Sequence, residues 1–410
     1  MEVGDLRLQG YTFAAALLWA LLLLILAPGS KGEPAARVGV DNDPEGAPYV
    51  AGELLVAYEP GTSEEAEETV IRRSGARTLE DLPGEVRLVY FPAIRRQAFE
   101  AARERALARA LKNLAHRAGI EAVDYNYLRG PSFMPNDPRL AYQWGLTSTR
   151  FGGAWNAAKG SGAKVAVVDS GVYFEHPDIG RIMAQRDFVE GDAVADDDNG
   201  HGTHVTGIAG ALTDNGKGVA GGCFKCGLLI AKVMGARAST TDSRIVKGIN
   251  WSVNQGADVM NLSLGGPGDS SVLRMAVNRA YGQGVVLVAA AGNEGVNEPR
   301  YPAAYSNVIA VGATTTDGKL APFSTRGDWV DLVAPGTGIL STSKSGSYDR
   351  QSGTSMSTPF VSGLAGLLAS QGLSAHSIRQ RMQSSARDLG PPGHDPYFGH
   401  GRIDADNAVR

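Results

Sequence analysis

The arrangement of apolar and polar residues divides the chain into three stretches, the first of which is an N-terminal apolar run. Residues 13–27 are fifteen uncharged, mostly aliphatic residues. Such a run suits the core of a signal peptide and is shorter than the roughly 20 residues of a membrane-spanning helix. We therefore expect a signal peptide over residues 1–30 and a secreted or extracytoplasmic protein. Because the segment before the run is poorly basic, an uncleaved N-terminal anchor is the alternative. Residues 31–49 are predicted to be a linker.

Residues 50–130 combine short apolar runs with amphipathic helical patterns. A long helix is predicted by an apolar stripe at helical spacing between Phe99 and Leu114. The other predicted elements are strands over 53–59, 86–91 and 122–128 and a helix over 63–74. This order predicts a small α+β domain of the split-βαβ, ferredoxin-like type. The basic residues between 95 and 117 are interpreted as a solvated helix surface, in preference to a membrane or nucleic-acid face.

From about residue 131 onward, apolar runs typical of buried parallel strands alternate with helical stretches. The runs are AKVAVVD, GLLIAKVMG, DVMNLSL, GVVLVAAAG, VIAVGA and VDLVAPG. Helices are predicted over 204–213, 242–255 and 270–283. The alternation predicts one α/β domain over 131–410, doubly wound around a mainly parallel sheet, with its chemistry at the carboxyl ends of the strands.

Composition narrows the possible functions. The 410 residues carry a net charge of -4, which gives no support to a nucleic-acid binder that relies on many phosphate contacts. Two cysteines are too few for a four-thiolate zinc site. Of the 53 glycines, 40 lie after residue 150, so the need for tight turns is concentrated in the α/β domain.

Three glycine-flanked motifs in that domain contain residues suited to acyl transfer: VAVVDSG (165–171), HGTHVTG (201–207) and GTSMSTP (353–359). A nucleophilic serine needs an imidazole to take its proton and a carboxylate to hold the imidazole. Ser355, His201 and Asp169 supply these groups in the order Asp, His, Ser. A zinc hydrolase that uses His201 and His204 as metal ligands is a second hypothesis.

Residues 131–410 resemble the catalytic domain of the subtilases, the subtilisin-like serine proteases. The resemblance rests on the three motifs together with HPDI, NLSLGG, VAAAGNEG, YPAAYSN and FSTRGDWVDLVAPG. It implies that Ser355 is the nucleophile, His201 the general base and Asp169 the orienting carboxylate. It also implies that Asn293 donates to the oxyanion, and that 50–130 is an inhibitory propeptide of the inhibitor I9 type, removed by self-cleavage.

A catalytically inactive subtilase acting as a binding or chaperone module is the alternative from another class. It is disfavoured because all four of these residues are present. The partners that the resemblance implies are protein or peptide substrates and the chain's own propeptide, with no nucleic acid and, after signal cleavage, no membrane. We expect a monomer, and a maturation cut between Tyr127 and Met134.

The resemblance also implies where a substrate binds. Substrate would add as a strand along Ser263, Leu264, Gly265 and Gly266, with Ala238, Ser239 and Thr240 as the opposite edge. The S1 pocket, which receives the side chain before the scissile bond, would lie between residues 264–266 and Ala290, Ala291 and Gly292. Glu294 and Arg300 would stand near that pocket with opposite charges, and we expect Arg300 to disfavour basic side chains there.

Calcium is the ion that the resemblance implies, held by oxygen ligands. The expected site comprises side chains of Asp137, Asp178 and Asn215 and carbonyls of Leu212, Lys217 and Val219. A second site is expected in an acidic loop, through Asp187, Glu190, Asp192 and Asp196.

Two further features depart from a plain protease domain. Cys223 and Cys226 have CxxC spacing, which in an exported protein favours a local disulfide over redox chemistry. Ser357 and Phe360 differ from the usual family pattern after the serine motif. Since neither replaces a proposed catalytic residue, we expect altered packing there without loss of activity.

Overall fold

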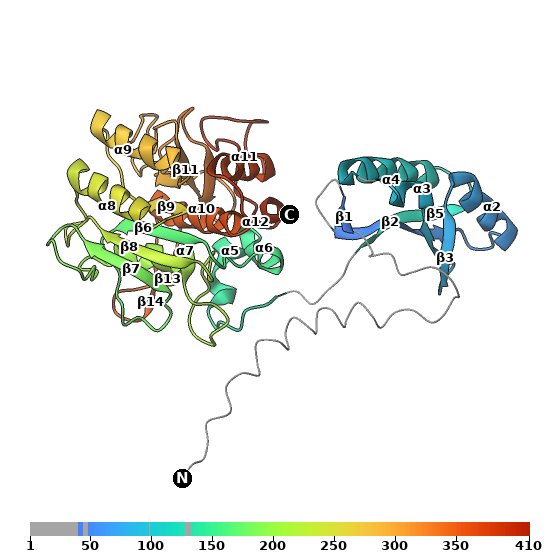
Figure 1. Cartoon of the computed structure of the whole chain (residues 1–410), viewed down its shortest axis with the longest axis horizontal. Helices are drawn as coiled ribbons and strands as arrows, with labels where there is room; N and C mark the ends of the chain where they lie inside the picture. Colours follow the sequence, from blue (N-terminus) through green and yellow to red (C-terminus); the bar gives the residue numbers. More distant parts are fainter. Residues whose placement is uncertain (1–39, 44–47, 98, 128–132) are drawn as a thin grey trace, which may run out of the picture. The chain divides into compact units, whose positions relative to one another are not determined.

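The structure, a computed structural model, describes residues 40–43, 48–97, 99–127 and 133–410. These residues form two compact units that divide near residue 128 (Figure 1). The predicted signal peptide and most of the predicted linker lie outside the described residues. In the part that is described, no helix is long and apolar enough to cross a membrane.

The first unit is an antiparallel sheet with helices on one face. Its strands are β1 (Val40–Asn42), β2 (Pro48–Tyr58), β3 (Arg77–Leu82), β4 (Val86–Tyr90) and β5 (Ile120–Tyr127). Its helices are α2 (Glu64–Ser74), α3 (Pro92–Arg95) and α4 (Glu100–Ala115). The order β3-β4-β2-β5, with β1 on the first residues of β2, confirms the predicted split-βαβ fold.

Two strands of this unit were not predicted. β3 is an edge strand that pairs only with β4 and is mostly exposed, so it lacks the alternation of a half-buried strand. β1 lies inside the predicted linker. The core of the unit instead follows the predicted apolar pattern, with Leu54, Val89 and Leu107 fully buried between sheet and helices.

The second unit is built on a seven-stranded parallel sheet. Its strands are β6 (Lys164–Asp169), β7 (Ile182–Asp187), β8 (Gly227–Lys232), β9 (Val259–Leu262), β10 (Val286–Ala290), β11 (Val308–Thr314) and β12 (Leu332–Pro335). They follow the order β12-β11-β10-β9-β6-β8-β7, and every neighbouring pair is parallel. A separate antiparallel hairpin joins β13 (Ile339–Thr342) and β14 (Tyr348–Gln351).

Helices cover both faces of this sheet, as the predicted doubly wound fold requires. The larger ones are α7 (His201–Gly210), α8 (Asp242–Asn254), α9 (Ser271–Gly282), α10 (Thr354–Ala369) and α11 (Ala375–Ser385). The shorter ones are α5 (Trp144–Ser148), α6 (Phe151–Ala157), α12 (Ala405–Val409) and the 3-10 turn η1 (Leu140–Tyr142). Ala166 and Val168 of β6 pack toward α8 and α9, whereas Val165 and Val167 pack toward α7 and α10.

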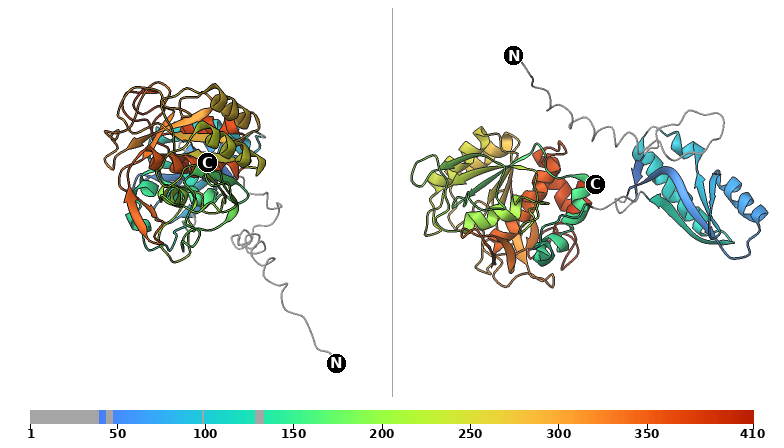
Figure 2. Two further views of the ribbon diagram at one scale, coloured as in Figure 1. Left: turned by 90° about the vertical axis from the view of Figure 1, so that its left-hand side faces the viewer. Right: turned by 90° about the horizontal axis from the view of Figure 1, so that it is seen from below.

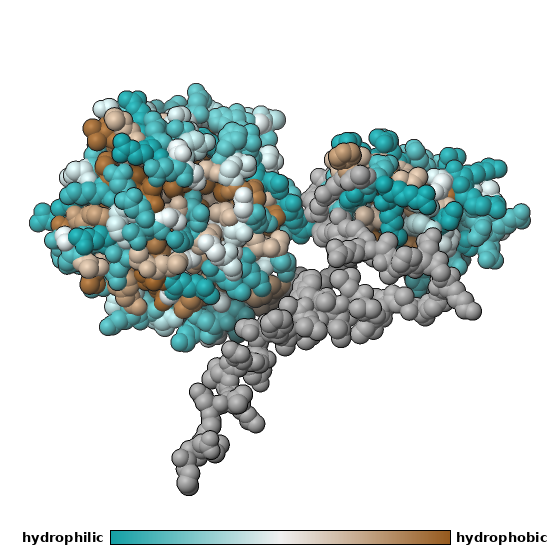
Figure 3. All heavy atoms as spheres, viewed as in Figure 1, coloured by the Kyte–Doolittle hydropathy of each residue, from teal (hydrophilic) through white to brown (hydrophobic). Residues whose placement is uncertain are grey.

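All six predicted strands of the second unit are present, whereas β7 and the hairpin strands β13 and β14 were not predicted. β7 is partly exposed and carries Arg and Gln, so it lacks a buried-strand run. α7 begins at His201, directly after Gly200. Helix α10 is almost wholly buried against the sheet (Figure 2). The face drawn in Figure 3 is largely polar, with apolar side chains scattered over it.

The order of the strands distinguishes the carboxyl end of β6 from the other strand ends. β6 has β8 on one side and β9 on the other, so the chain changes direction across the sheet beside β6. Ligands of doubly wound sheets bind at such a switch point, outside the carboxyl ends of the strands. Asp169 is the last residue of β6.

Candidate active site

Asp169 ends the central strand with a fully buried side chain. Its Oδ1 accepts a hydrogen bond from the backbone N–H of Ser170 at 2.7 Å and lies 2.8 Å from Nδ1 of His201. A buried carboxylate is costly unless it is hydrogen-bonded or paired. The imidazole and the neighbouring amide therefore stabilise Asp169 where the strand ends.

His201 reaches Asp169 because the start of α7 packs directly on the loop after β6. A Cβ atom at Gly202 would overlap the carbonyl oxygen of Gly171, so only glycine permits this approach. The hydroxyl of Ser170 accepts from the N–H of Gly202 at 2.9 Å and ties the two segments together. The glycines of the VAVVDSG and HGTHVTG motifs thus bring the two side chains into contact.

Electrostatics at His201 favours a charged imidazole. Burial lowers the pKa of His201, but attraction and hydrogen bonding to Asp169, with a further contribution from Asp197, outweigh it. The pKa therefore lies above the ordinary value for histidine. A neighbouring carboxylate of this kind holds the ring in one orientation and stabilises the imidazolium.

His204, one turn further along α7, has different surroundings. Its side chain is fully buried, and burial lowers its pKa to about 4. Its Nε2 lies 3.5 Å from a carboxylate oxygen of Asp349 on β14, whereas His201 faces Asp169. Among the described residues the only cluster of three potential metal ligands is elsewhere. The two histidines therefore do not form the paired zinc ligands of the second hypothesis.

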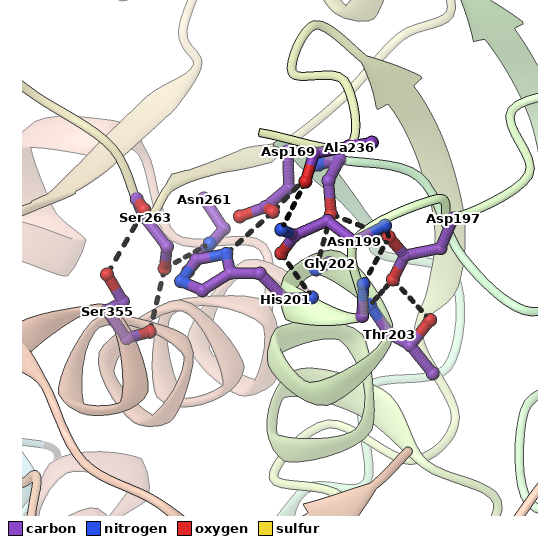
Figure 4. A network of polar contacts seen from close by, with 12 residues as sticks. Asp169, Asp197, Asn199, His201, Gly202, Thr203, Ala236, Asn261, Ser263 and Ser355 are labelled. Atoms are coloured by element: carbon purple, nitrogen blue, oxygen red, sulfur yellow. Dashed lines mark hydrogen bonds and ion pairs between the residues drawn. The ribbon is translucent and has the colours of Figure 1, made fainter. Parts of the chain in front are cut away.

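Ser355 lies in the first turn of α10, facing the same space as His201 (Figure 4). Its Oγ donates to the backbone oxygen of Ser263 at 3.2 Å, and no hydrogen bond between Ser355 and His201 is present in the described structure. The hydroxyl of Ser263 donates back to the backbone oxygen of Ser355 at 2.8 Å and accepts from the amide of Asn261 at 2.9 Å.

Asn261 is a residue that the sequence reasoning did not assign to the site. It lies on β9, fully buried, and its Oδ1 accepts from Ser362 on α10 at 2.9 Å. Asn261 thus links the strand that carries Ser263 to the helix that carries Ser355. A buried amide inside an otherwise apolar strand was the available signal, because buried polar groups need partners.

Asn293 follows β10 and is exposed at the same space. Its Oδ1 accepts from the backbone N–H and the hydroxyl of Thr354, at 2.8 and 3.0 Å. With the oxygen engaged there, the amide nitrogen remains as a donor toward the cavity. The side chain is therefore oriented by the residue that directly precedes Ser355.

His201, Asn293 and Ser355 line one cavity of about 460 Å³. Of the predicted substrate residues, Ser263, Leu264, Gly265 and Gly292 line it, together with Ala238, Ser239 and Thr240. Gly266 lines an adjoining cavity of about 260 Å³ with Tyr301. Ala291 is fully buried and does not line either cavity, whereas its neighbour Ala290 does.

Arg300 and Glu294 also line the larger cavity. Nε of Arg300 lies 3.2 Å from Oε2 of Glu294, and one of its terminal nitrogens lies 3.3 Å from Glu298. Burial raises the pKa of Glu294, but hydrogen bonds from Thr325 and Arg300 outweigh it and hold the pKa below its ordinary value. The cavity therefore contains an engaged ion pair.

The segments expected to bind calcium do meet in the structure. Asp137 and Asp178 are buried, and the amide of Asn215 donates to Asp178 at 2.9 Å. Burial raises the pKa of Asp137, and the charge of Asp178 raises it further. No Lys or Arg of the described residues forms an ion pair with either carboxylate.

The three backbone positions lie on the same loop. The N–H of Leu212 donates to the backbone oxygen of Asp178, and the N–H of Val219 donates to its side chain, both at 2.8 Å. The backbone N–H of Lys217 donates to Oδ1 of Asn215 at 2.8 Å, so the side-chain amide of Asn215 presents its nitrogen to Asp178. Asp137 and Asp178 are buried and have no Lys or Arg partner among the described residues, so together they fit a divalent ion. The side-chain amide of Asn215 would have to rotate to present its oxygen to that ion.

The acidic loop expected to bind a second ion gathers three carboxylates. Oxygens of Asp187, Glu190 and Asp192 lie within 4.8 Å of one another. Asp196 is not part of this group. The side chain of Lys232 lies 3.1 Å from Asp187 and neutralises part of its charge.

Cys223 and Cys226 form a disulfide, in agreement with the sequence prediction. Ser357 donates from its hydroxyl to the backbone oxygen of Ala334 at 3.0 Å, and Phe360 packs in the core. Both departures from the family pattern are therefore accommodated inside the fold.

Comparison with known proteins places this chain in a family. The family model described as "Subtilase family" matches residues 160–401. Thermitase of Thermoactinomyces vulgaris is 45% identical over 280 residues, which is 68% of this chain and 100% of thermitase. A thermophilic serine proteinase of Bacillus sp. (strain AK1) is 39% identical over 364 residues, 88% of each chain. A solved protease structure from Pseudoalteromonas arctica PAMC 21717 has a TM-score of 0.64 at 32% identity, covering 68% of this chain and 99% of that one.

The chain belongs to the subtilase family. It is a subtilisin-like serine endopeptidase with the α/β fold of that family, as its sequence predicted.

Replacing Asp169 tests the electrostatics of the histidine. In Asp169→Asn the attraction is lost while the burial remains, so the pKa of His201 should fall below its value in the unmodified protein. An NMR titration of the imidazole protons measures this directly. The raised pKa also stabilises the fold below the ordinary histidine pKa, and that contribution should disappear as pH rises through the raised value.

Asp349→Asn is the control, because this carboxylate faces His204 and not His201. It should leave the titration of His201 unchanged. An unchanged or higher pKa in Asp169→Asn would contradict the assignment.

Proposed function

We propose that this endopeptidase hydrolyses peptide bonds through Asp169, His201 and Ser355 and is made as a secreted, self-processing precursor stabilised by calcium. The observation that carries the catalytic part is the contact of 2.8 Å between Asp169 and His201 beside a cavity that also contains Ser355. The proposal assigns the chemistry to the protein's own side chains, in the manner of the Ser-His-Asp template.

Acylation begins with a turn of the Ser355 hydroxyl away from the backbone oxygen of Ser263 and toward His201. His201 takes the proton as Oγ attacks the substrate carbonyl, and later gives it to the leaving amine. Asp169 holds the ring and stabilises the imidazolium. Water then attacks the acyl-enzyme with the same histidine as base, which releases the second product and restores Ser355.

The developing oxyanion needs donors on the opposite side of the carbonyl. We assign them to the amide nitrogen of Asn293 and the backbone N–H of Ser355, one of the unpaired donors in the first turn of α10. Thr354 holds the oxygen of Asn293, so the donor is preorganised before substrate binds. Preorganised donors of this kind stabilise the transition state more than the ground state.

Removal of these groups tests the mechanism on casein and a peptide substrate. Ser355→Ala should lose activity by on the order of 10⁶ in kcat, the scale that subtilisin itself supplies, and should leave the precursor uncut. Asn293→Ala should lose about 10²–10³ in kcat with little change in KM, again the subtilisin magnitude. Ser357→Ala is the matched control and should keep its activity, because this serine is buried away from the cavity.

Equal activity of Ser355→Ala and the unmodified enzyme would overturn the mechanism. An inactive Ser355→Ala that is still processed would instead contradict self-cleavage alone.

The first unit is proposed to be the propeptide. An alignment that covers 88% of this chain must include most of that unit, so the Bacillus proteinase contains a similar N-terminal region. In the first unit of this chain, the face of the sheet opposite the helices carries partly exposed apolar side chains, Leu55, Leu88 and Tyr90. Such a face suits binding to another folded surface.

Secretion is supported by the apolar run at residues 13–27 and by the disulfide, which persists in oxidising compartments.

The cavity beside Ser355 is proposed to select substrates through Arg300. Its pairing with Glu294 occupies the carboxylate that a basic substrate side chain would need. Arg300 itself repels such a side chain. We therefore propose that uncharged side chains are preferred before the scissile bond.

Arg300→Ala should raise the relative kcat/KM for substrates with Lys or Arg at P1 about tenfold, the equivalent of 1.4 kcal/mol. A peptide library with all side chains at P1 measures the change. Arg274→Ala, at an exposed pair outside the larger cavity, should leave the preference unchanged. A preference of the unmodified enzyme for basic P1 residues would refute the assignment.

Calcium is proposed to bind between Asp137 and Asp178, and a second ion at Asp187, Glu190 and Asp192. The ion supplies structural stabilisation and takes no part in the chemistry. At a thousand times its Kd it would add about 4 kcal/mol to the free energy of unfolding. The binding would link the loop around Asn215 to the N-terminal end of the protease domain.

Chelation tests this directly. EGTA should accelerate thermal inactivation of the unmodified enzyme, and added calcium should restore the original, slower rate of inactivation. In Asp178→Asn the enzyme should inactivate rapidly and respond less to calcium. Asp317→Asn, at an exposed carboxylate, should behave like the unmodified enzyme. Inactivation that is indifferent to the chelator would argue against both sites.

A further inference from the structure

Phe133, the first described residue of the second unit, is held by contacts that the catalytic mechanism does not use. Its ring stacks on Phe224 with a centroid distance of 5.5 Å and meets Trp155 edge-on at 6.3 Å. Nζ of Lys159 lies 3.9 Å from the centre of the same ring. The backbone N–H of Phe133 donates to the side chain of Asn156 at 2.6 Å. We call the four partner residues, Trp155, Asn156, Lys159 and Phe224, the Phe133 socket.

The two aromatic residues of the Phe133 socket are part of the core. Trp155 and Phe224 are almost fully buried, and their rings meet edge-on at 5.5 Å. The indole N–H of Trp155 donates to the backbone oxygen of Gly222 at 2.9 Å. Trp155 and Phe224 are therefore fixed by their own packing and present a preformed surface for the ring of Phe133.

The disulfide shapes one wall of this socket. Cys223 and Cys226 enclose Phe224 in a short loop, and the N–H of Lys225 donates to the backbone oxygen of Lys159 at 3.0 Å. Both sulfurs are buried. A Cβ atom at Gly366 would lie 2.8 Å from the sulfur of Cys226, so the core leaves space for the bridge. The bridge thereby holds Phe224 in position to stack on Phe133.

After Phe133, the next hydrogen bonds that tie this segment to the rest of the domain begin at Asn136, whose side-chain oxygen accepts from the N–H of Gly216 at 2.7 Å. Residues 133–137 form neither helix nor strand, and the next side chain, Met134, is 79% exposed. Further on, the backbone N–H of Asn136 donates to Asp214 at 3.3 Å. An exposed, irregular segment is readily cut by an endopeptidase, which binds extended backbone. Released from the socket, this end would be open to cleavage by the enzyme itself.

We propose that the Phe133 socket anchors the N-terminal end of the protease domain, is retained through maturation, and protects that end against self-trimming. The proposal rests on the proposed self-processing, since it requires the maturation cut to lie on the N-terminal side of Phe133. The disulfide then acts through the anchor, by holding Phe224. Release of this end is the first step of thermal inactivation.

Thermal inactivation of the processed enzyme, with mass spectrometry of its N-terminus, tests the anchor. Phe133→Ala should keep its activity at 25 °C but have about a tenfold shorter half-life at elevated temperature, because a contact that is lost before global unfolding controls the rate. Its N-terminus should be trimmed beyond residue 133. Phe133→Tyr should keep the long half-life, because the ring contacts remain.

Two further variants separate the anchor from a general loss of packing. Tyr142→Ala removes an exposed aromatic ring from the same segment and should leave the half-life unchanged. Replacing both cysteines by alanine should shorten the half-life, and adding Phe133→Ala should shorten it little more, because both changes act on one contact.

Three outcomes would overturn the proposal. One is a mature enzyme that begins after Phe133, and another is a half-life of Phe133→Ala equal to that of Tyr142→Ala. The third is fully additive effects of the cysteine and Phe133 replacements. Failure of the proposed self-processing is recognised separately, because Ser355→Ala would then still be cut.

Discussion

The buried carboxylate of Asp169 is the constraint on which the rest of the site depends. A carboxylate at the end of a central strand, out of contact with water, costs several kcal/mol unless polar groups surround it. Its Oδ1 has two partners, the amide of Ser170 and the imidazole of His201. Both require that the loop after β6 and the start of α7 lie almost in contact, and this is why glycine occupies position 202. The same attraction raises the pKa of His201, so the contact that stabilises the carboxylate also suits the ring to the proposed role of base.

Ser355, the proposed nucleophile, is positioned by a second set of contacts, centred on helix α10. Thr354 orients the side chain of Asn293. Ser263 and Ser355 exchange hydrogen bonds. The hydroxyl of Ser362 donates to the side chain of Asn261 on β9. These links connect the carboxyl ends of β9 and β10 to one buried helix. Because α10 is packed on almost every side, a shift of Ser355 would require repacking of the core. The stability of the core and the geometry of the reaction are therefore coupled.

Among the strands of the two sheets, the sequence predicted the well-buried ones and missed β3 and β7, whose side chains are mostly or partly exposed. The six apolar runs became six adjacent strands, because a strand buried on both faces must be apolar throughout. β3 and β7 lie at sheet edges with polar side chains, and their identity as strands comes from backbone pairing to a neighbour. Asn261 was missed for a related reason, since its partner Ser362 lies 101 residues away along the chain. Ala291, assigned to the substrate pocket with Gly292, lies behind the cavity wall because successive residues of an extended chain point to opposite sides.

The sequence by itself determined the fold class, the residues available for catalysis and the position of the disulfide, because each depends on periodicity or on motifs of neighbouring residues. Tertiary structure alone decided how those residues meet. It sets the Ser355 hydroxyl toward Ser263, pairs Arg300 with Glu294 and brings two carboxylates 41 positions apart, Asp137 and Asp178, to one loop. It also seats Phe133 against Phe224. Such contacts join residues far apart in the chain, and their energies depend on burial and distance, which only the packed structure specifies.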